Sequence, residues 1–272
     1  MLDFGLNQVT MAHAPIDEFV EVAARLGMVG VELRNDLDRP IFDGLPAGHI
    51  AQMLRDQGLR LLGLSQAYPF NRWSDDMAAE IRSLIDLAVE AGAETISLIP
   101  CNDGSGLDEA TRRDDLARAL GFSLPLLEAG DMVALVEPLG FARSSLRDRA
   151  ELVAAIDALD AQDRFRLVHD TFHDKLAGGG PIFADQIGIV HISGVVDPDV
   201  PVTQMEDEHR VLIDADDRLG NLDRIRDLRA AGYRGVYSFE CFSPEVQGLA
   251  SPEQAIRTSM NFISSHVQDI AA

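Results

Sequence analysis

Along this chain, helix-like stretches alternate with short apolar runs, and a glycine separates the two at five places. The runs are continuous and rich in β-branched or aromatic residues, as expected of buried strands. Glycine is favoured just after a helix because it adopts the left-handed conformation without a Cβ clash. These glycines are Gly27, Gly58, Gly92, Gly130 and Gly232, and the runs after them begin at positions 29, 59, 95, 132 and 236. The pattern predicts an alternating β/α chain.

Two of the predicted helices carry clear start signals. Ser74 is followed by Asp75 and Asp76, which is typical of an N-cap and an acidic first turn. Apolar residues then recur at helical spacing, at Met77, Ile81, Leu84, Ile85 and Ala88. The segment Ser-Pro-Glu-Gln at 251–254 combines a capping box with proline at the first helical position. It predicts a final helix that runs to about Val267.

Eight strands are predicted, with helical or looped segments between them and a closing helix at the end. Their approximate ranges are 2–7, 29–34, 59–65, 94–99, 132–137, 165–170, 187–192 and 235–240. The chain has 272 residues, and a (β/α)8 barrel needs roughly 250. No linker-like tract divides the chain, so we expect an α/β protein with one (β/α)8 TIM-barrel domain over residues 1–272. A polar, irregular stretch from Val195 to about Asp217 predicts a long loop after the seventh strand.

Composition narrows the class of protein further. The 45 acidic residues outnumber the 23 basic ones and give a net charge of −22, which weighs against a nucleic-acid partner. No apolar run approaches the length of about 20 residues that a membrane span needs. Cys101 and Cys241 have no paired spacing, so we expect no disulfide. With no basic leader visible, a cytoplasmic location is the expectation.

Four predicted strands in the second half of the chain end on residues that can bind a metal ion. These residues are Glu137, Asp170, His191 and Glu240. In a barrel they belong to strands five to eight, whose carboxyl ends face one mouth, where active sites lie. An oxygen-rich set with one imidazole suits Mn²⁺, Mg²⁺, Co²⁺ or Zn²⁺. We therefore expect one divalent ion at this mouth as the cofactor.

Each of these residues also has a simpler interpretation. Either glutamate could form a buried ion pair with Arg34 or Arg143, because an uncompensated buried carboxylate is costly. Asp170 could cap the helix that follows it. The imidazole of His191 could be satisfied by a backbone carbonyl in the core.

In its order of motifs, the chain resembles the xylose-isomerase-like sugar isomerases and epimerases, most closely their inosose (2-keto-myo-inositol) isomerase branch. The resemblance covers nearly the whole length. Its strongest parts are Leu-Val-His-Asp-Thr-Phe-His at 167–173, Val-His-Ile at 190–192, Asp-Glu-His-Arg at 207–210 and Ser-Phe-Glu-Cys-Phe-Ser-Pro-Glu at 238–245. The chain departs from the family pattern at Ser193-Gly194, where an acidic residue is common, and after Arg210, where a glycine-rich turn is usual.

The resemblance implies that Glu137, Asp170, His191 and Glu240 hold one metal ion and that Glu137 and Glu240 also move protons on opposite faces of a sugar. It further implies that His173 and Arg210 contact the substrate. Arg34 lies at the end of the second predicted strand, and Phe70 and Trp73 lie on an early loop over the same mouth, so we expect all three to contact the substrate too. The expected activity is isomerisation or epimerisation of a keto-polyol or ketose, such as an inosose, through an enediolate.

Three other functions use a similar scaffold. A dehydratase acting on an inosose or a dehydroshikimate-type substrate would share every site residue. A phosphodiesterase of the apurinic-endonuclease type would require more metal ligands and a basic face for DNA, neither of which the sequence contains. A catalytically silent sugar-binding barrel is the third. The sequence leaves the oligomeric state open, a homo-oligomer included.

Overall fold

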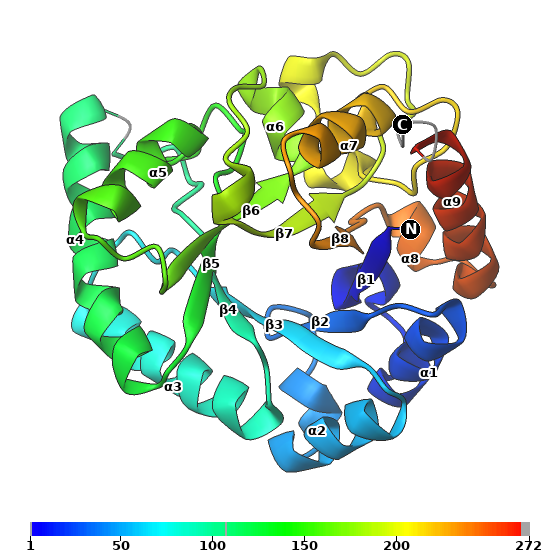
Figure 1. Cartoon of the computed structure of the whole chain (residues 1–272), viewed down its shortest axis with the longest axis horizontal. Coiled ribbons are helices and arrows are strands. Elements are labelled where there is room, and N and C mark those ends of the chain that lie inside the picture. Colours follow the sequence, from blue (N-terminus) through cyan, green and yellow to red (C-terminus); the bar gives the residue numbers. More distant parts are fainter. Residues whose placement is uncertain (1, 107, 268–272) are drawn as a thin grey trace.

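The computed structural model of the chain describes residues 2–106 and 108–267, in which eight parallel strands form a closed barrel. The strands are β1 (Asp3–Asn7), β2 (Gly30–Arg34), β3 (Arg60–Ala67), β4 (Thr95–Leu98), β5 (Val133–Val136), β6 (Phe165–Asp170), β7 (Ile187–Ile192) and β8 (Val236–Phe239). Each strand pairs with the next, and β8 pairs with β1 to close the ring, as Figure 1 shows. The predicted (β/α)8 TIM barrel is confirmed.

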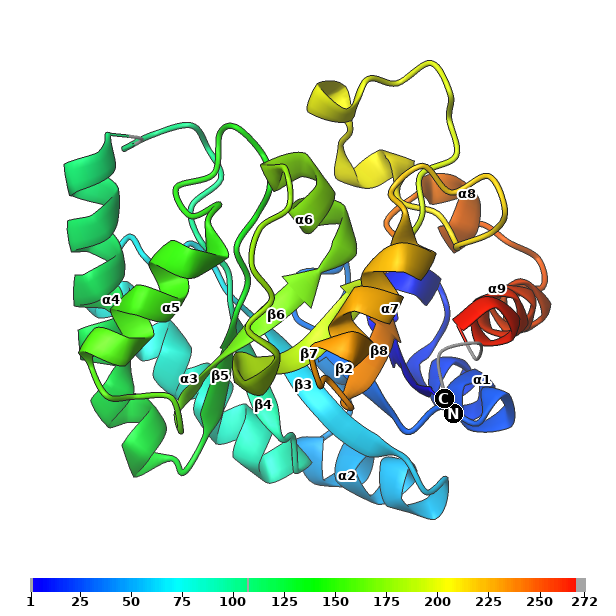
Figure 2. The same cartoon turned by 45° about the horizontal axis from the view of Figure 1, so that its top comes forward.

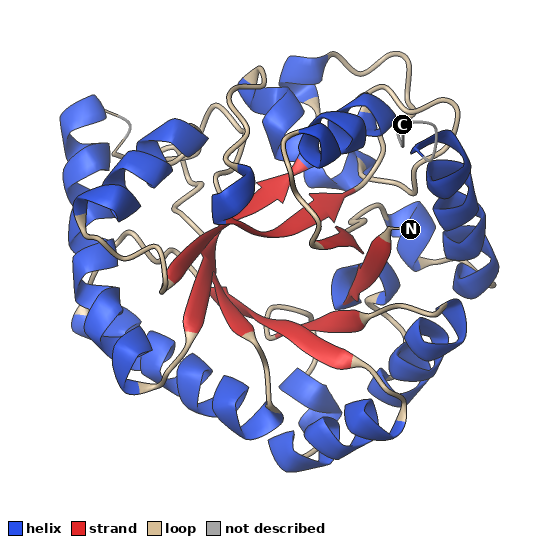
Figure 3. Ribbon diagram, in the orientation of Figure 1, coloured by secondary structure: helices blue, strands red, loops and turns tan. Residues whose placement is uncertain are grey.

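Helices surround the ring of strands on the outside (Figure 3). They are α1 (Ile16–Leu26), α2 (Ala47–Asp56), α3 (Asp75–Ala91), α4 (Glu109–Ala129), α5 (Arg149–Ala158), α6 (Thr171–Ala177), α7 (Asn221–Ala230), α8 (Pro244–Gln247) and α9 (Pro252–Val267). The strands are apolar because protein covers both of their faces, as is usual in parallel sheets. Strand residues Leu33, Leu64 and Ile96 are completely buried, and burying such a side chain contributes about 1.5–3 kcal/mol.

Glycine is required after the helices for two different reasons, backbone conformation at one position and lack of space for a side chain at another. Gly27 follows α1 in the left-handed conformation, with φ of 73°, as predicted. Gly130 follows α4 with φ of −91°, so the prediction that it is left-handed is wrong. Asp131 takes the positive φ instead, at 47°. Glycine is required at 130 because a Cβ there would lie 2.3 Å from Cγ2 of Ile85 on α3.

The loops at the carboxyl ends of the strands build one mouth of the barrel. The longest of them follows β7 and contains two short 3₁₀ helices, Val202–Gln204 and Asp207–His209. It rises above the ring in Figure 2, and an isolated antiparallel bridge between Gly194 and Val211 ties its base together. None of the described helices combines the length and apolarity that crossing a bilayer requires.

Candidate metal centre

Four buried side chains from four neighbouring strands converge at this mouth. Glu137 follows β5 directly, Asp170 is the last residue of β6, His191 lies next to the end of β7, and Glu240 follows β8 directly. One donor atom from each lies within 4.8 Å of the others. The sequence predicted this convergence because parallel strands that are adjacent in a barrel end at the same mouth.

The cluster fits one divalent ion. Oε1 of Glu137 and Nδ1 of His191 are buried and make no hydrogen bond within residues 2–106 and 108–267. Metal–oxygen and metal–nitrogen bonds of about 2.0–2.2 Å place opposite donors roughly 4.0–4.4 Å apart. The observed spacing of up to 4.8 Å therefore needs only a small contraction. Three carboxylates and one imidazole are a donor set that Mn²⁺, Co²⁺, Zn²⁺ and Mg²⁺ accept.

The charge balance at the mouth leads to the same conclusion. The buried carboxyl groups are those of Glu32, Glu137, Asp170 and Glu240. The buried guanidinium groups among them are those of Arg34 and Arg210. Two negative charges therefore remain in excess when His191 is neutral, and uncompensated buried charge costs several kcal/mol. One divalent ion balances this excess.

His191 is oriented by a carboxylate on the side away from the cluster. Its Nε2 lies 3.0 Å from Oε2 of Glu32. The other oxygen of this carboxylate, Oε1, accepts a hydrogen bond of 2.5 Å from Oγ of Ser238. With the proton on Nε2, Nδ1 is free to coordinate, and it lies 3.2 Å from Glu240 and 3.8 Å from Glu137. A carboxylate that fixes the tautomer of a ligating histidine is a common arrangement around protein-bound metals.

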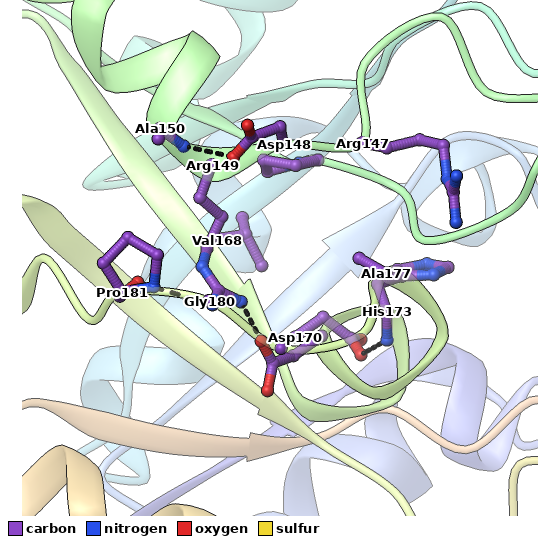
Figure 4. Close-up of a pocket in the computed structure, with 13 residues that line it drawn as sticks. Arg147, Asp148, Arg149, Ala150, Val168, Asp170, His173, Ala177, Gly180 and Pro181 are labelled. Carbon is purple, nitrogen blue, oxygen red and sulfur yellow. Dashed lines mark hydrogen bonds and ion pairs between the residues drawn. The ribbon is translucent and has the colours of Figure 1, made fainter.

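Asp170 combines the helix cap that the sequence offered with a position in the cluster. Its Oδ1 caps α6 by accepting hydrogen bonds from the backbone N–H groups of Phe172, at 2.7 Å, and His173, at 2.9 Å. Figure 4 shows the contact with His173 at the start of the helix. Its Oδ2 faces the cluster and accepts a 2.5 Å hydrogen bond from Nη2 of Arg210. The cap thus orients the carboxylate and leaves one oxygen for a metal ion.

In the metal-free protein, the pKa values of the two glutamates are shifted in opposite directions. Burial, reinforced by the negative charge of Glu240, raises the pKa of Glu137 to about 7. Burial would raise the pKa of Glu240 as well, but His191 and the two arginines outweigh it and hold that pKa well below its usual value. Glu137 can therefore exchange a proton near neutral pH, whereas Glu240 stays ionised.

Both arginines predicted at the site lie in it. Arg210 is buried rather than solvated, and its Nη2 donates to Asp170 and, at 2.9 Å, to Glu240. Ser193 accepts a 3.0 Å hydrogen bond from its Nε, so the serine found where the family often has an acidic residue positions this arginine. Nη1 of Arg34 donates to Oε1 of Glu240 at 2.9 Å.

The ion-pair interpretation of the glutamates is thus correct for Glu240, which pairs with Arg34 and Arg210. It is wrong for Arg143, which forms a bidentate pair with Glu206 at 2.7 and 2.6 Å instead. That pair joins the loop after β5 to the loop after β7.

A cavity of about 220 Å³ opens above the cluster. It is lined by Arg34, Asp36, Ser65, Gln66, Tyr68, Ile99, Asn102, Glu137, Leu139, Phe141, His173, His191, Asp207, Arg210, Glu240 and Phe242. Burial and the neighbouring charge of Arg210 lower the pKa of His173 to about 3, so this imidazole is neutral and can offer a hydrogen bond to a ligand. Its Nε2 lies 3.8 Å from Oε1 of Glu137.

The structure places neither of the aromatic residues predicted to contact substrate, Phe70 and Trp73, in the lining of this cavity. Phe70 is completely buried in the core, since the loop after β3 turns it inward. Trp73 stacks on Phe122 of α4 with ring centroids 5.2 Å apart. The rings at the cavity belong to Tyr68, Phe141 and Phe242.

Glu32 is the main functional candidate that sequence reasoning did not single out. It is a lone carboxylate in the apolar strand Val29-Gly30-Val31-Glu32-Leu33, and it is 1% exposed. An acidic residue in the middle of a buried strand needs a specific partner. That signal was available in the sequence, but the identity of the partner, His191, was not.

Fold and site together define a (β/α)8 barrel with a buried carboxylate–imidazole cluster at its catalytic mouth. Residues 20–266 match the family model of the xylose isomerase-like TIM barrels, so the chain belongs to that family. No curated protein sequence matches the chain.

Solved structures of similar fold span almost the whole chain. A xylose isomerase domain-containing protein from Salmonella typhimurium LT2 is 30% identical, with a TM-score of 0.87 over 97% of this chain and 96% of that one. The IOLI protein, solved with a zinc atom, is 17% identical, with a TM-score of 0.85 over 100% of both chains. A probable 3-DHS dehydratase, AsbF of Bacillus anthracis, is 13% identical, with a TM-score of 0.75 over 97% of this chain and 99% of that one. The last two likenesses concern the fold alone.

Proposed function

We propose that the protein is a divalent-metal-dependent isomerase or epimerase of a keto-polyol or ketose, such as an inosose, and that it acts through an enediolate. The observation that carries this proposal is the buried cluster of Glu137, Asp170, His191 and Glu240, whose two glutamates both line one small cavity. Carboxyl groups positioned around one reacting centre are typical of acid–base chemistry. The IOLI structure, which was solved with a zinc atom, supports a divalent ion as the cofactor.

In this proposal Glu137, Asp170, His191 and Glu240 hold the metal ion, which would polarise the substrate carbonyl and make the adjacent C–H bond more acidic. Glu137 accepts that proton, because its Oε1 makes no hydrogen bond among the described residues, whereas Glu240 is held by Arg34 and Arg210. Isomerisation returns this proton from Glu137 to the neighbouring carbon. In epimerisation, ionised Glu240 removes the proton from one face and protonated Glu137 returns a proton to the other face. Neutral His173 donates a hydrogen bond to a substrate oxygen.

The arginines of the cavity are already paired with carboxylates, and this pairing favours an uncharged substrate. Among the described residues that line it, Arg34 already pairs with Asp36 and Glu240. Arg210 already pairs with Asp170, Glu240 and, at 3.3 Å, Asp207. A carboxylate or phosphate on the substrate would compete with these carboxylates for the arginines, and the pairs with Asp170 and Glu240 are fully buried. A neutral polyol avoids that competition.

The same argument bears on the dehydratase alternative, which the likeness to a probable 3-DHS dehydratase keeps relevant. A dehydroshikimate-type acid would meet the paired arginines described above. A neutral inosose would not, and its enediolate could expel a β-hydroxyl group. Product analysis separates the two reactions, because dehydration gives a new ultraviolet-absorbing enone and isomerisation does not.

The test of the proposed function is α-proton exchange of inososes and ketoses in deuterated water, with Mn²⁺, Co²⁺ or Zn²⁺ added. We expect metal-dependent deuterium incorporation with at least one of them. Glu137→Gln should slow it by about 10²–10⁴-fold, the usual contribution of a general base. Glu245→Gln, an exposed change on α8, is the matched control and should keep the wild-type rate. Wild-type exchange by Glu137→Gln would refute the assignment of the base.

A further inference from the structure

A second cavity lies beside the small cavity above the metal cluster. This side groove has a volume of about 430 Å³. Its polar and aromatic lining consists of His13, Arg34, Asp36, Asp38, Arg39, Phe242 and Gln247. Arg34, Asp36 and Phe242 line both cavities and form the wall between them. The loops after β1, β2 and β8 therefore place the side groove directly next to the cluster.

The polar groups of the side groove are held in place by the fold. Asp36 receives two hydrogen bonds from Arg34, at 2.8 and 2.7 Å. Arg39 donates to the carbonyl of Ala14 at 2.6 Å and lies 3.1 Å from Asp43. Fixed hydrogen-bonding groups cost little entropy when a ligand binds, and this groove combines them with the phenyl ring of Phe242. Carboxylate, guanidinium, imidazole and amide groups beside an aromatic ring suit a ring bearing several hydroxyl groups.

Two other sides of the catalytic cavity are bounded by protein. The bidentate pair of Arg143 and Glu206 joins the loops after β5 and β7 on the side of Phe141. Beyond His173, the first turn of α6 separates the cavity from another space of about 380 Å³. Arg149 lines that space, as Figure 4 shows, and it pairs with Asp174. The side groove is therefore a direction in which a substrate larger than the cavity can extend.

We propose that the side groove is a second sugar subsite, which binds a glycosyl or similar polyhydroxylated group attached to the reacting keto-sugar. This inference rests on the proposed function, because the reacting ring is placed at the metal cluster. The catalytic cavity alone, at about 220 Å³, is smaller than the roughly 300–1,000 Å³ of most small-molecule sites. With the side groove added, the combined space falls within that range. The groove brings together two aspartates, Arg39 and His13, which favours an uncharged ring.

The test compares fructose with four glycosyl-fructoses of different linkage, namely turanose, maltulose, lactulose and isomaltulose. Isothermal titration of the Mn²⁺-loaded protein measures binding, and deuterium exchange measures turnover. We expect at least one disaccharide to bind about tenfold more tightly than fructose. His13→Trp fills the groove and should abolish this preference, whereas His49→Trp, an exposed change on α2, should preserve it.

The two proposals fail in different ways. If no disaccharide is preferred to fructose, or if both tryptophan variants keep the preference, the side groove is not a sugar subsite. If the preference and its loss in His13→Trp are observed but no ligand exchanges its α-proton, the subsite stands and the isomerase assignment fails. A circular-dichroism melt of both variants shows that the comparison is made on folded protein.

Discussion

At the scale of single residues, the cluster depends on two arginines that serve as permanent counter-charges. Arg34 and Arg210 are buried, and the surrounding carboxylates raise both pKa values despite the effect of burial. They offset part of the repulsion among the four buried carboxyl groups without occupying the space of the ion. The remaining negative charge then sets how strongly the site attracts a divalent metal.

Replacing Arg210 should separate the stabilisation of the metal-free cluster from the attraction that the cluster has for a divalent metal. Arg210→Met should lower the metal-free stability by about 3–5 kcal/mol, because Asp170 and Glu240 lose a buried partner. Adding Mn²⁺ should raise Tm more in this variant than in the wild type, because the cluster is more negative. Arg149→Met, which breaks the other buried pair with Asp174, is the control and should show the wild-type metal shift. Equal metal shifts in all three proteins would contradict this account.

The pH dependence of metal binding follows from two raised pKa values. Burial lowers the pKa of His191, but Glu240 and Glu32 outweigh it and raise that pKa well above its usual value. Glu137 titrates at about 7. Both groups therefore carry protons below these values in the metal-free protein, and a metal ion must displace them. Affinity for Mn²⁺ should fall as the pH drops through neutrality, by roughly tenfold per pH unit for each displaced proton.

Titrations at about pH 6 and about pH 8, in buffers of different ionisation enthalpy, count the protons released. Glu32→Gln should reduce the slope, because it removes a charge that raises the pKa of His191. A slope unchanged by this substitution would show that His191 does not ligate the ion.

The predicted site residues that the structure brings together are those whose position a strand end determines. Glu137, Asp170, His191 and Glu240 each follow or end an apolar run, so the barrel alone places them. Phe70 and Trp73 lie away from the cavity, because a loop decides which way its aromatic residues turn. Hydrophobicity alone does not distinguish a ring that packs in the core from one that lines a cavity.

At the scale of elements, the predicted strands agree with the observed ones to within about two residues. Helix termini were predictable where a cap is local, as at Ser74, whose Oγ accepts a 3.1 Å hydrogen bond from the N–H of Met77. The end of α4 at Gly130 was predicted as well, but the reason for this glycine was not, because the requirement comes from Ile85 on another helix. Contacts between elements are the part that a single sequence leaves undetermined.

A double-mutant cycle can test this difference between the glycines. Gly130→Ala should destabilise the protein by about 1–3 kcal/mol through overpacking against Ile85. The cost should shrink in the Ile85→Ala background, because the clashing methyl group is absent. Gly27→Ala should cost about 1–2 kcal/mol through its positive φ, and this cost should be the same in both backgrounds. Urea denaturation measures all the differences, and additive energies for Gly130 and Ile85 would rule out the steric explanation.

At the scale of the whole molecule, the net negative charge and the paired arginines of the mouth both disfavour a polyanionic substrate. A net charge of −22 opposes the approach of a phosphodiester backbone, and the buried arginines at the mouth are already paired. These features argue against the phosphodiesterase alternative without any knowledge of the substrate. The loops that form the side groove come from the first, second and last strands, so no single segment of sequence could have revealed it.

The pairing of β8 with both β7 and β1 has a consequence for how the site comes into existence. During synthesis, a chain that has emerged only as far as β7 has two open sheet edges and three of the four residues of the cluster. Glu240 arrives with the strand that joins those edges, and Glu32 already stands near the other end of the chain. Closing the ring and completing the cluster are therefore one event. We expect full metal affinity only in the finished molecule.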